Sequence, residues 1–460
     1  MGRLFFLSLL SVISVVSLAR PWIGVVCAYL FVILTPQAVW YWNFEDLRPV
    51  YWVLIPTLIG FLWRLLSGKY DLSIVKNRRV MFALVLWLAF ALSYFTGPYV
   101  DVQGPYRFSD PSVGLETLNK IFVLMLVGCV CVNSERSLKW LVIVMMISAI
   151  YLTYWANAQY LTGQIFGRLA GPVDQDGVGI YRDENNFAML FVVAQPFLWN
   201  MGFMFKARWQ RWALWLVIPF TWHAIFLTAS RGGLVGVAAT TLILGLRSKH
   251  RMLGLLLLPA FFFVYQWQAG DLMKSRAETI SEYRTESSAA TRIEAWQAAL
   301  RMIGDHPVSG VGLASFGPAF PDYSDRHPRE AHNTFLQITA ESGVVAGAMY
   351  VLIFVTSIIA LWKNGNVTRA RNEADPANRS VQLLYLVNES TLVATCGLVV
   401  CSLFLSLQQF ELSYFLQVMV NAVLYLSSRS PAAVGDPNIA PAGGKHERKS
   451  RKLLRRPQKT

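Results

Sequence analysis

A short turn between two apolar segments contains the first residues suited to binding an anion, Thr228-Ala-Ser-Arg-Gly-Gly233. Ser230 is a favourable N-cap for a helix that starts close to Gly232, and the free N–H groups and positive dipole of a helix start attract anions. Gly232 and Gly233 would also let a ligand approach the backbone closely. Arg231 adds a cation to this already positive end, which is unfavourable for a purely structural residue. We therefore interpret Arg231 as an anion ligand rather than as an interfacial arginine.

A second group of polar residues lies between 167 and 187 and contains Arg168, Arg182 and Asp183-Glu-Asn-Asn186. Asp183 is expected to be the N-cap of a helix that begins near Asn186. The two arginines are either phosphate ligands or ion-pair partners of the neighbouring acids, and the sequence leaves both possibilities open. The acidic run 174–179 does not open a calcium loop, because valine and asparagine occupy the fifth and twelfth ligand positions.

The third group, Asp325-Arg-His-Pro-Arg-Glu-Ala-His-Asn333, lies where a long polar segment enters an apolar one. Positively charged surroundings lower the pKa of an imidazole and keep it neutral, which is the form that a general base needs. His332, with Asn333 beside it, is therefore a candidate base; the alternative is that it caps the helix that follows. His327 is the nearest competitor, and His306, before a proline, is a weaker one.

The composition shows what must position these groups. The chain has 460 residues, of which 55% are hydrophobic and only 15% are charged, whereas a soluble globular chain has about 25% charged residues. This excludes a set of soluble domains, a disordered chain, a coiled coil and a basic globule that binds nucleic acid. All five cysteines lie in or at the ends of apolar stretches, so neither a disulfide framework nor a zinc site is expected.

Apolar runs long enough to form membrane helices recur along the whole chain, since one crossing needs roughly 20 residues. They lie at about 4–19, 22–40, 50–67, 80–96, 117–133, 139–158, 186–204, 212–229, 232–246, 252–269, 334–362, 381–407 and 411–427. The sequence thus predicts an all-α polytopic membrane protein with 12–13 transmembrane helices.

The positive charge is unevenly distributed between the polar breaks. The polar breaks are the segments between apolar runs, and every second one belongs to a set that is rich in Lys and Arg. This set holds 27 of the 41 Lys and Arg residues and lies at 20, 64–79, 136–139, 206–211, 247–251, 363–379 and 429–459. The positive-inside rule places these breaks and the C-terminus in the cytoplasm. Arg3 and Ser17-Leu-Ala19 also resemble a signal peptide, but cleavage would reverse this parity, so a helical hairpin or a single crossing within 1–40 is favoured.

Four regions are predicted from these patterns. Residues 1–269 form an N-terminal transmembrane bundle with external loops at 97–116 and 159–185. Residues 270–331 form a large external loop, with a helix at 291–303. Residues 332–428 form the C-terminal transmembrane helices, and 429–460 form a basic, disordered cytoplasmic tail near anionic lipid headgroups. The apolar face of the loop helix is predicted to comprise Ile293, Trp296, Ala299, Leu300 and Ile303.

The external segments are rich in arginine and lack a metal-binding motif. The arginines are at 168, 182, 231, 284, 292 and 301. Because the rigid guanidinium fork matches phosphate oxygens, a membrane site of this kind indicates a lipid-linked phosphate or pyrophosphate substrate that is handled without a metal or another cofactor.

Four motifs in order resemble the O-antigen ligase family. They are Ser230-Arg-Gly-Gly233 at a helix start, Arg292-x-x-x-Trp296, Asp305-His-Pro-Val-Ser-Gly-Val-Gly312 and His332-Asn-Thr-Phe-Leu-Gln337. That family shares a superfamily with the O-antigen polymerases and the bacterial O-oligosaccharyltransferases, and the resemblance covers about 165–362.

Two further segments, Arg20-Pro-Trp-Ile-Gly24 and Ala170-Gly-Pro with Asp183-x-Asn-Asn186, are more similar to the exosortase-associated O-glycosylation ligases of that superfamily. The family pattern has a proline after the aspartate and a shorter insert. Arg182 is therefore a candidate to replace or supplement Arg168.

The resemblance implies a GT-C-like fold in the inner membrane of a Gram-negative bacterium. It also implies metal-independent transfer of a glycan from undecaprenyl pyrophosphate to lipid A–core, a protein hydroxyl or another glycan, on the periplasmic side. Arg168, Arg231 and Arg292 would hold the pyrophosphate and His332 would be the base. Two alternatives stay open: a polymerase, and a glycolipid transporter or flippase, although transporters tend to show inverted repeats and broken helices near the midplane.

Overall fold

The computed structural model describes residues 2–44, 47–102, 110–165, 167–173, 179–248, 251–271, 273–274 and 287–429. All regular elements in these ranges are helices, so the chain is an all-α polytopic membrane protein, as predicted. The elements are α1 (Gly2–Ala19), α2 (Pro21–Ile33), α3 (Pro36–Val39), α4 (Tyr41–Phe44), α5 (Pro49–Leu66), η1 (Leu72–Val75), α6 (Arg78–Thr96), α7 (Pro111–Cys131), α8 (Glu135–Leu161), α9 (Glu184–Met201), η3 (Gly202–Met204), α10 (Arg208–Thr228), α11 (Arg231–Arg247), α12 (Arg251–Leu255), α13 (Leu257–Gln268), α15 (Ser287–Asp305), α16 (Phe316–Ala319), η4 (Phe320–Asp322), α17 (Thr334–Ala374), α18 (Arg379–Ser402) and α19 (Glu411–Arg429).

Every predicted apolar run contains a helix, and eight of the described helices are long and apolar enough to cross a membrane. Two predicted boundaries are wrong. Helix α7 begins at Pro111 rather than near 117, because Asp110 accepts hydrogen bonds from the N–H groups of Ser112 and Val113 and proline suits the first helical position. The external loop predicted at 97–116 is shorter accordingly. Helix α17 continues to Ala374, well beyond 362.

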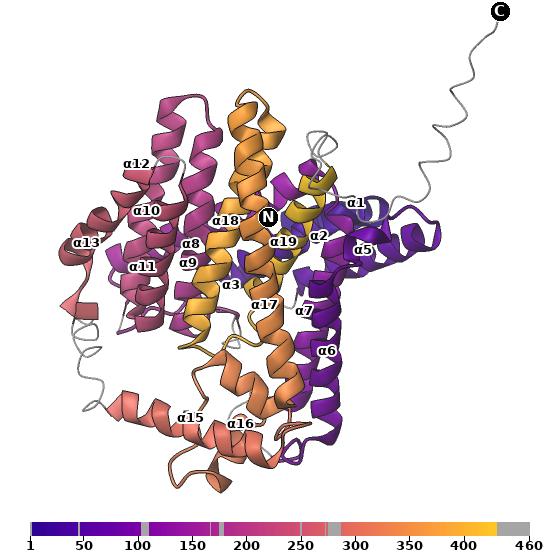
Figure 1. The fold of residues 1–460 in the computed structure, drawn as a ribbon, viewed down its shortest axis with the longest axis vertical. Coiled ribbons are helices and arrows are strands. Elements are labelled where there is room, and N and C mark those ends of the chain that lie inside the picture. Colours follow the sequence, from indigo (N-terminus) through magenta and orange to yellow (C-terminus); the bar gives the residue numbers. More distant parts are fainter. Residues whose placement is uncertain are drawn as a thin grey trace, which may run out of the picture.

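The helices form an upright bundle, and α15 lies across one end of it (Figure 1). At that end the backbone N–H of Tyr99, after α6, donates to Val311 at 3.0 Å, and that of Leu169 donates to Leu227 at 2.9 Å. The Thr334 hydroxyl donates to Leu405 at 2.6 Å. The polar segments of the predicted external set therefore meet at the α15 end.

The basic breaks meet at the opposite end of the bundle. Arg369 donates to the carbonyl of Arg247 at 2.6 Å, and Arg379 donates to that of Met204 at 2.7 Å. Arg247 also makes two hydrogen bonds, of 2.8 and 2.7 Å, to the buried carboxylate of Glu389. The alternation of the breaks between two ends, inferred from charge, is therefore present in the fold.

Of the two arrangements that the sequence left open for residues 1–40, the first helices adopt the hairpin. Arg64, near the end of α5, donates to the carbonyl of Ala19 at 2.7 Å, so the turn between α1 and α2 lies at the basic end. The other end of α1 is close to the region of α3 and α4, where the ring centroids of Phe6 and Phe44 are 4.5 Å apart. Helix α1 thus runs the length of α5.

A loop that follows α15 is locked to a break in α17. Gly343 has φ of 81° and interrupts the helix. The carbonyls of Ala340 and Glu341, freed by this break, accept hydrogen bonds from the N–H groups of Val311 and Gly312 at 2.9 and 3.0 Å. A Cβ at Gly310 would lie 2.3 Å from the Glu341 backbone. The sequence Ser-Gly-Val-Gly therefore permits a close backbone approach that fixes α15 against α17.

Helix α15 spans Ser287–Asp305 and so extends beyond the predicted 291–303 at both ends, and its predicted apolar face is partly wrong. Ile293 and Leu300 are exposed. The buried face is made instead by Ala295, Ala298, Ala299 and Met302. Small side chains on this face allow α15 to pack closely on the segment around α16 and α17, whereas larger ones at those positions would hold it away.

These two ends generate a topology prediction. A reporter that is active only outside the cytoplasm should be active when fused after Gly163 or Gly270, and inactive after Lys76 or Asp375, because the second pair lies at the basic end. Reporter activity normalised to expression is the measurement. Activity after Lys76 with silence after Gly163 would reverse the orientation of the bundle.

Candidate functional site

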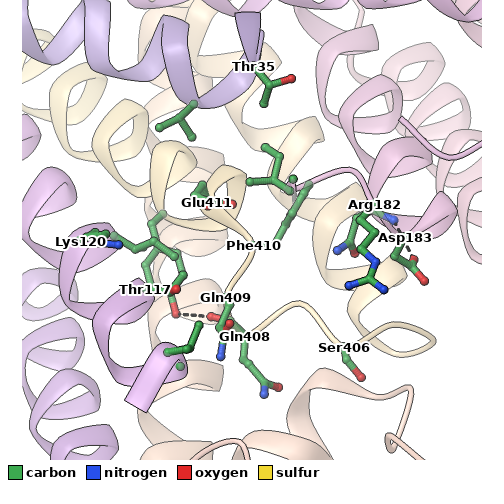
Figure 2. A pocket seen from close by; sticks show the side chains of 18 of the residues that line it. Thr35, Thr117, Lys120, Arg182, Asp183, Ser406, Gln408, Gln409, Phe410 and Glu411 are labelled. Carbon is green, nitrogen blue, oxygen red and sulfur yellow. Dashed lines mark hydrogen bonds between the residues drawn. The ribbon is translucent and has the colours of Figure 1, made fainter. Parts of the chain in front are cut away.

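A large cavity lies between the helices towards the α15 end. Its volume is about 1020 Å³, and its walls come from α2, α3, α5, α7, the start of α9, the loop before α17 and the segment between α18 and α19. One wall carries Arg182 and Asp183, and the opposite wall carries Lys120 of α7 (Figure 2). His332 also lines the cavity. The space between the helices is therefore polar on several sides and suits a ligand with charged groups.

Among the helices that begin at this end, three have side-chain caps next to residues that the sequence predicted for the site. Asp183 caps α9 and accepts from Asn185 N and Asn186 N at 2.8 and 3.2 Å, as predicted. Ser230 caps α11 and accepts from Gly233 N at 3.1 Å. The same hydroxyl donates to the Asn185 side chain at 2.7 Å, which joins the starts of α9 and α11. Their positive dipole ends face one region of the molecule.

Asn333 is the third of these caps, because its side chain accepts from Phe335 N and Leu336 N, each at 3.1 Å. The question left open by the sequence, whether His332 is itself the cap, is thus answered in favour of Asn333. The His332 imidazole is free of that role and is half-buried at the cavity wall. Trp296 of α15 donates to the carbonyl of Ala331 at 2.9 Å, which holds the backbone beside it.

The surroundings of His332 keep its imidazole neutral. Burial lowers the pKa of His332 below its ordinary value, and the nearby guanidinium of Arg292 lowers it further. The Asp183 carboxylate acts in the opposite direction, and Arg329 and Arg168 lower the pKa again. Residues from α15, from the loop before α9 and from the loop before α17 therefore act electrostatically on one imidazole and together favour its neutral form, which a general base needs.

Arg168 and Arg182 have different positions. Arg168 donates to Thr228 O at 3.0 Å and to the Asn185 side chain at 3.2 Å, and it pairs with Glu184 at 3.3 Å. It does not line the cavity, whereas Arg182 and Asn186 do. Of the two alternatives left open by the sequence, the ion-pair role is therefore observed for Arg168.

Arg231 is the first residue of α11 and is half-buried, outside the cavity wall. It adjoins Ser230 and hence the Asn185–Arg168 group. The space that a side chain at Gly233 would need is taken by Ala188, 2.7 Å from an added Cβ, and Leu405 lies 3.4 Å from one at Gly232. Gly233 therefore allows α11 to pack closely on Ala188 of α9, whereas a Cβ at Gly232 would make only an ordinary contact with Leu405.

Other predicted residues lie apart from the site. Arg301 of α15 is exposed and donates to the carbonyl of Tyr323. His327 is exposed, and Tyr99 packs edge-on against His306 with ring centroids 6.4 Å apart. Arg284, residues 174–178 of the acidic run and the basic tail from 430 lie outside the described residues.

Sequence reasoning missed a carboxylate next to the candidate base. Glu330 faces the cavity, so its side chain is accessible although protein surrounds it. Burial raises the pKa of Glu330, and the negative charge of Asp183 raises it further. A hydrogen bond with Ser406 lowers the pKa. The position of Glu330 two residues before His332 was the available signal.

A second missed group is a buried polar network in the same wall. The carboxylate of Glu341 accepts from the side chains of Gln337 at 3.1 Å and Gln408 at 2.9 Å, and from Ala314 N at 3.2 Å. The Ser406 hydroxyl donates to Gln337. Glu341 appeared in the sequence only as a polar residue inside an apolar run, which is a functional signal in a membrane helix.

Backbone strain is concentrated around this cavity. In the described chain, four non-glycine residues have positive φ: Thr35 (49°), Ala229 (47°), Ala314 (55°) and His332 (47°). Thr35, Ala314 and His332 line the cavity, and Ala229 precedes the cap of α11. Residues other than glycine adopt this conformation at an energetic cost, and such positions cluster at functional sites.

Comparison with known families supports the resemblance that the motifs indicated. Residues 212–351 match the family described as O-antigen ligase. The match includes Arg231, Arg292 and His332 and supports the O-antigen ligase superfamily, with a glycosyltransferase of ligase or polymerase type in general. Together with the apolar helices, it indicates a multi-pass membrane protein. The curated proteins searched contain no match to the chain.

The electrostatics of His332 can be tested without any assay of activity. In histidine-labelled protein, NMR titration should show the His332 imidazole gaining its proton below about pH 6.5, the ordinary value. Arg292→Gln should move this midpoint upwards, because it removes a nearby positive charge. Arg301→Gln, an exposed change on the same helix, is the control. An unchanged midpoint in Arg292→Gln would show that the two groups are not coupled.

Proposed function

We propose that the protein transfers a glycan from undecaprenyl pyrophosphate to an acceptor hydroxyl, at the α15 end of the bundle and on the periplasmic side of a bacterial inner membrane. The observation that carries this proposal is the cavity wall that holds the half-buried His332 together with Arg182 and Arg329. Guanidinium groups suit the pyrophosphate, and a neutral imidazole suits proton abstraction.

In the proposed reaction His332 takes the proton of the acceptor hydroxyl. The acceptor oxygen then forms a bond to the anomeric carbon of the donor sugar while the bond from that carbon to the pyrophosphate oxygen breaks. The electron pair of that bond leaves with the pyrophosphate. A single displacement of this kind inverts the anomeric configuration, so the product glycoside is expected to have the opposite configuration to the donor.

The leaving pyrophosphate gains negative charge during this step. Arg182 in the cavity wall, together with the guanidinium groups around His332, would stabilise that charge. Arg231 and the positive dipole end of α11, next to Ser230, would stabilise the same negative charge. Arg168 is held by Glu184 and Asn185, and Ser230 caps α11, before any substrate arrives, so little reorganisation of these groups is needed in the transition state. No step of this scheme uses a metal or an organic cofactor.

The acceptor is a hydroxyl of lipid A–core, of a protein or of another glycan. A deletion strain distinguishes these classes. Loss of the lipopolysaccharide ladder indicates lipid A–core, loss of glycoproteins indicates a protein acceptor, and shortened chains indicate a polymerase. In detergent, release of undecaprenyl pyrophosphate without a membrane gradient separates an enzyme from a transporter.

Removal of the proposed base should slow glycan transfer strongly. His332→Ala should lower the transfer rate by at least about a hundredfold, the lower range for loss of a general base, while donor binding is kept. His327→Ala is the matched control and should cost much less, because that residue is exposed and outside the cavity wall. Single-turnover transfer in detergent is the measurement. Near-normal turnover of His332→Ala, or retention of configuration, would contradict the mechanism.

The proposed anion site predicts a difference between two substitutions of one residue. Arg231→Ala should abolish transfer, and Arg231→Lys should restore little, because a point charge does not reproduce the bidentate contacts of a guanidinium group. Arg301→Ala should leave transfer near normal. Full activity of Arg231→Ala at equal expression would remove Arg231 from the pyrophosphate site.

A further inference from the structure

The segment between α18 and α19 forms a wall of the cavity that the proposed reaction does not use. It runs from Leu403 to Phe410, and Leu405, Ser406, Gln408, Gln409 and Phe410 line the cavity together with Glu411 at the start of α19 (Figure 2). These side chains are amides, a hydroxyl and a carboxylate rather than cations. Their chemistry therefore differs from that of the arginine-rich side around His332.

Gln408 is held in one orientation with its carbonyl oxygen unused. Its amide nitrogen donates to the Glu341 carboxylate at 2.9 Å. Because a carboxylate only accepts hydrogen bonds, the nitrogen must face Glu341 and the oxygen must point away from it. That oxygen is buried and has no hydrogen-bond partner among the described residues. The whole residue is only 8% exposed.

The same wall holds Gln408 in place before any ligand binds. The Tyr414 hydroxyl donates to the backbone carbonyl of Gln408 at 2.9 Å. Glu341 is fixed in turn by Gln337 and by Ala314 N. A rigid, buried acceptor that lacks a partner is costly unless a ligand or water supplies a donor.

Three further polar atoms along this cavity are also hydrogen-bond acceptors without a partner. One oxygen of Glu411, the hydroxyl of Thr35 and the side-chain oxygen of Gln37 are buried and lack partners among the described residues. Thr35 is 2% exposed. Glu411 is the first residue of α19, where a carboxylate also benefits from the helix dipole, but that interaction leaves its second oxygen unsatisfied. All of these atoms can accept a hydrogen bond.

The ligand that satisfies several acceptors must present several donors. Sugar hydroxyls do so, whereas an ionised phosphate or carboxylate offers only acceptors. We propose that Gln408 and Glu411, with Thr35 and Gln37 further along the cavity, form a subsite for a neutral sugar residue and exclude an acidic one at that position. This rests on the proposed function and names which sugars its site accepts.

The test compares probes with and without a sugar. Dissociation constants are measured in detergent for undecaprenyl pyrophosphate, for the same lipid carrying one N-acetylglucosamine, and for methyl N-acetylglucosaminide. The proteins are the wild type, Gln408→Met, the isosteric Glu411→Gln, and Gln382→Met as a control at the basic end, where Gln382 donates to Phe203 O. Binding is read directly, so the result does not depend on turnover.

We expect Gln408→Met to weaken a sugar-bearing probe by about fivefold, the effect of one hydrogen bond, with the bare lipid and Gln382→Met unchanged. Weakening of the sugar-bearing lipid identifies the donor sugar, and weakening of the methyl glycoside alone identifies the acceptor sugar. Methyl glucuronide should bind more weakly than the neutral glycoside, and Glu411→Gln should reduce that difference.

If both sugar-bearing probes bind equally to the wild type and to Gln408→Met, the unpartnered oxygen meets only water and the subsite is wrong. Failure of the bare pyrophosphate lipid to bind, with glycoside binding that still depends on Gln408, would instead refute the proposed donor and leave the sugar subsite standing. The two proposals therefore fail in different measurements.

Discussion

In an apolar layer each backbone N–H and C=O must find its partner inside the protein, and the rest of this fold depends on that constraint. Helices satisfy it along their lengths, so irregular backbone collects at their ends or in protected places. Here the breaks meet at two ends, one basic and one with α15 across it. The interruption of α17 at Gly343 is tolerated because loop N–H groups bond the carbonyls that it frees. The cavity occupies the end where capped helix starts converge.

Rigidity at this end comes from contacts that link residues distant in sequence. Asn185 accepts from both Ser230 and Arg168, and so joins the starts of α9 and α11 to the loop before α9. Trp296 joins α15 to the residue preceding His332. The Trp296 bond to Ala331 and the Asn333 cap flank His332, which has a positive φ of 47°, a conformation that persists only where the surroundings over-determine it. The strained position therefore follows from tertiary contacts on either side of it.

The sequence predicted the helices well because apolar runs and caps are local signals. Asp183 and Ser230 were recognisable as caps from the residues that follow them. The buried face of α15 was predicted wrongly, since the choice between Ala298 and Leu300 depends on how closely α17 approaches. The Gln408–Glu341 pair joins residues 67 positions apart, and no local pattern specifies such a contact. Its only trace in the sequence was a polar interruption between two apolar runs.

The two sides of the cavity differ in charge in a way that would orient a lipid-linked glycan. Arg182 and Arg329 supply positive charge and hydrogen-bond donors on the side of His332, whereas Glu341, Glu411 and Gln408 supply acceptors. A pyrophosphate is attracted to the arginines, and sugar hydroxyls are suited to the acceptors. One covalently joined donor satisfies both only when its anomeric carbon lies between them, beside His332. In the proposed reaction, contacts to the pyrophosphate and to the sugar hydroxyls would therefore place the anomeric carbon beside His332. No contact to the anomeric carbon itself is needed.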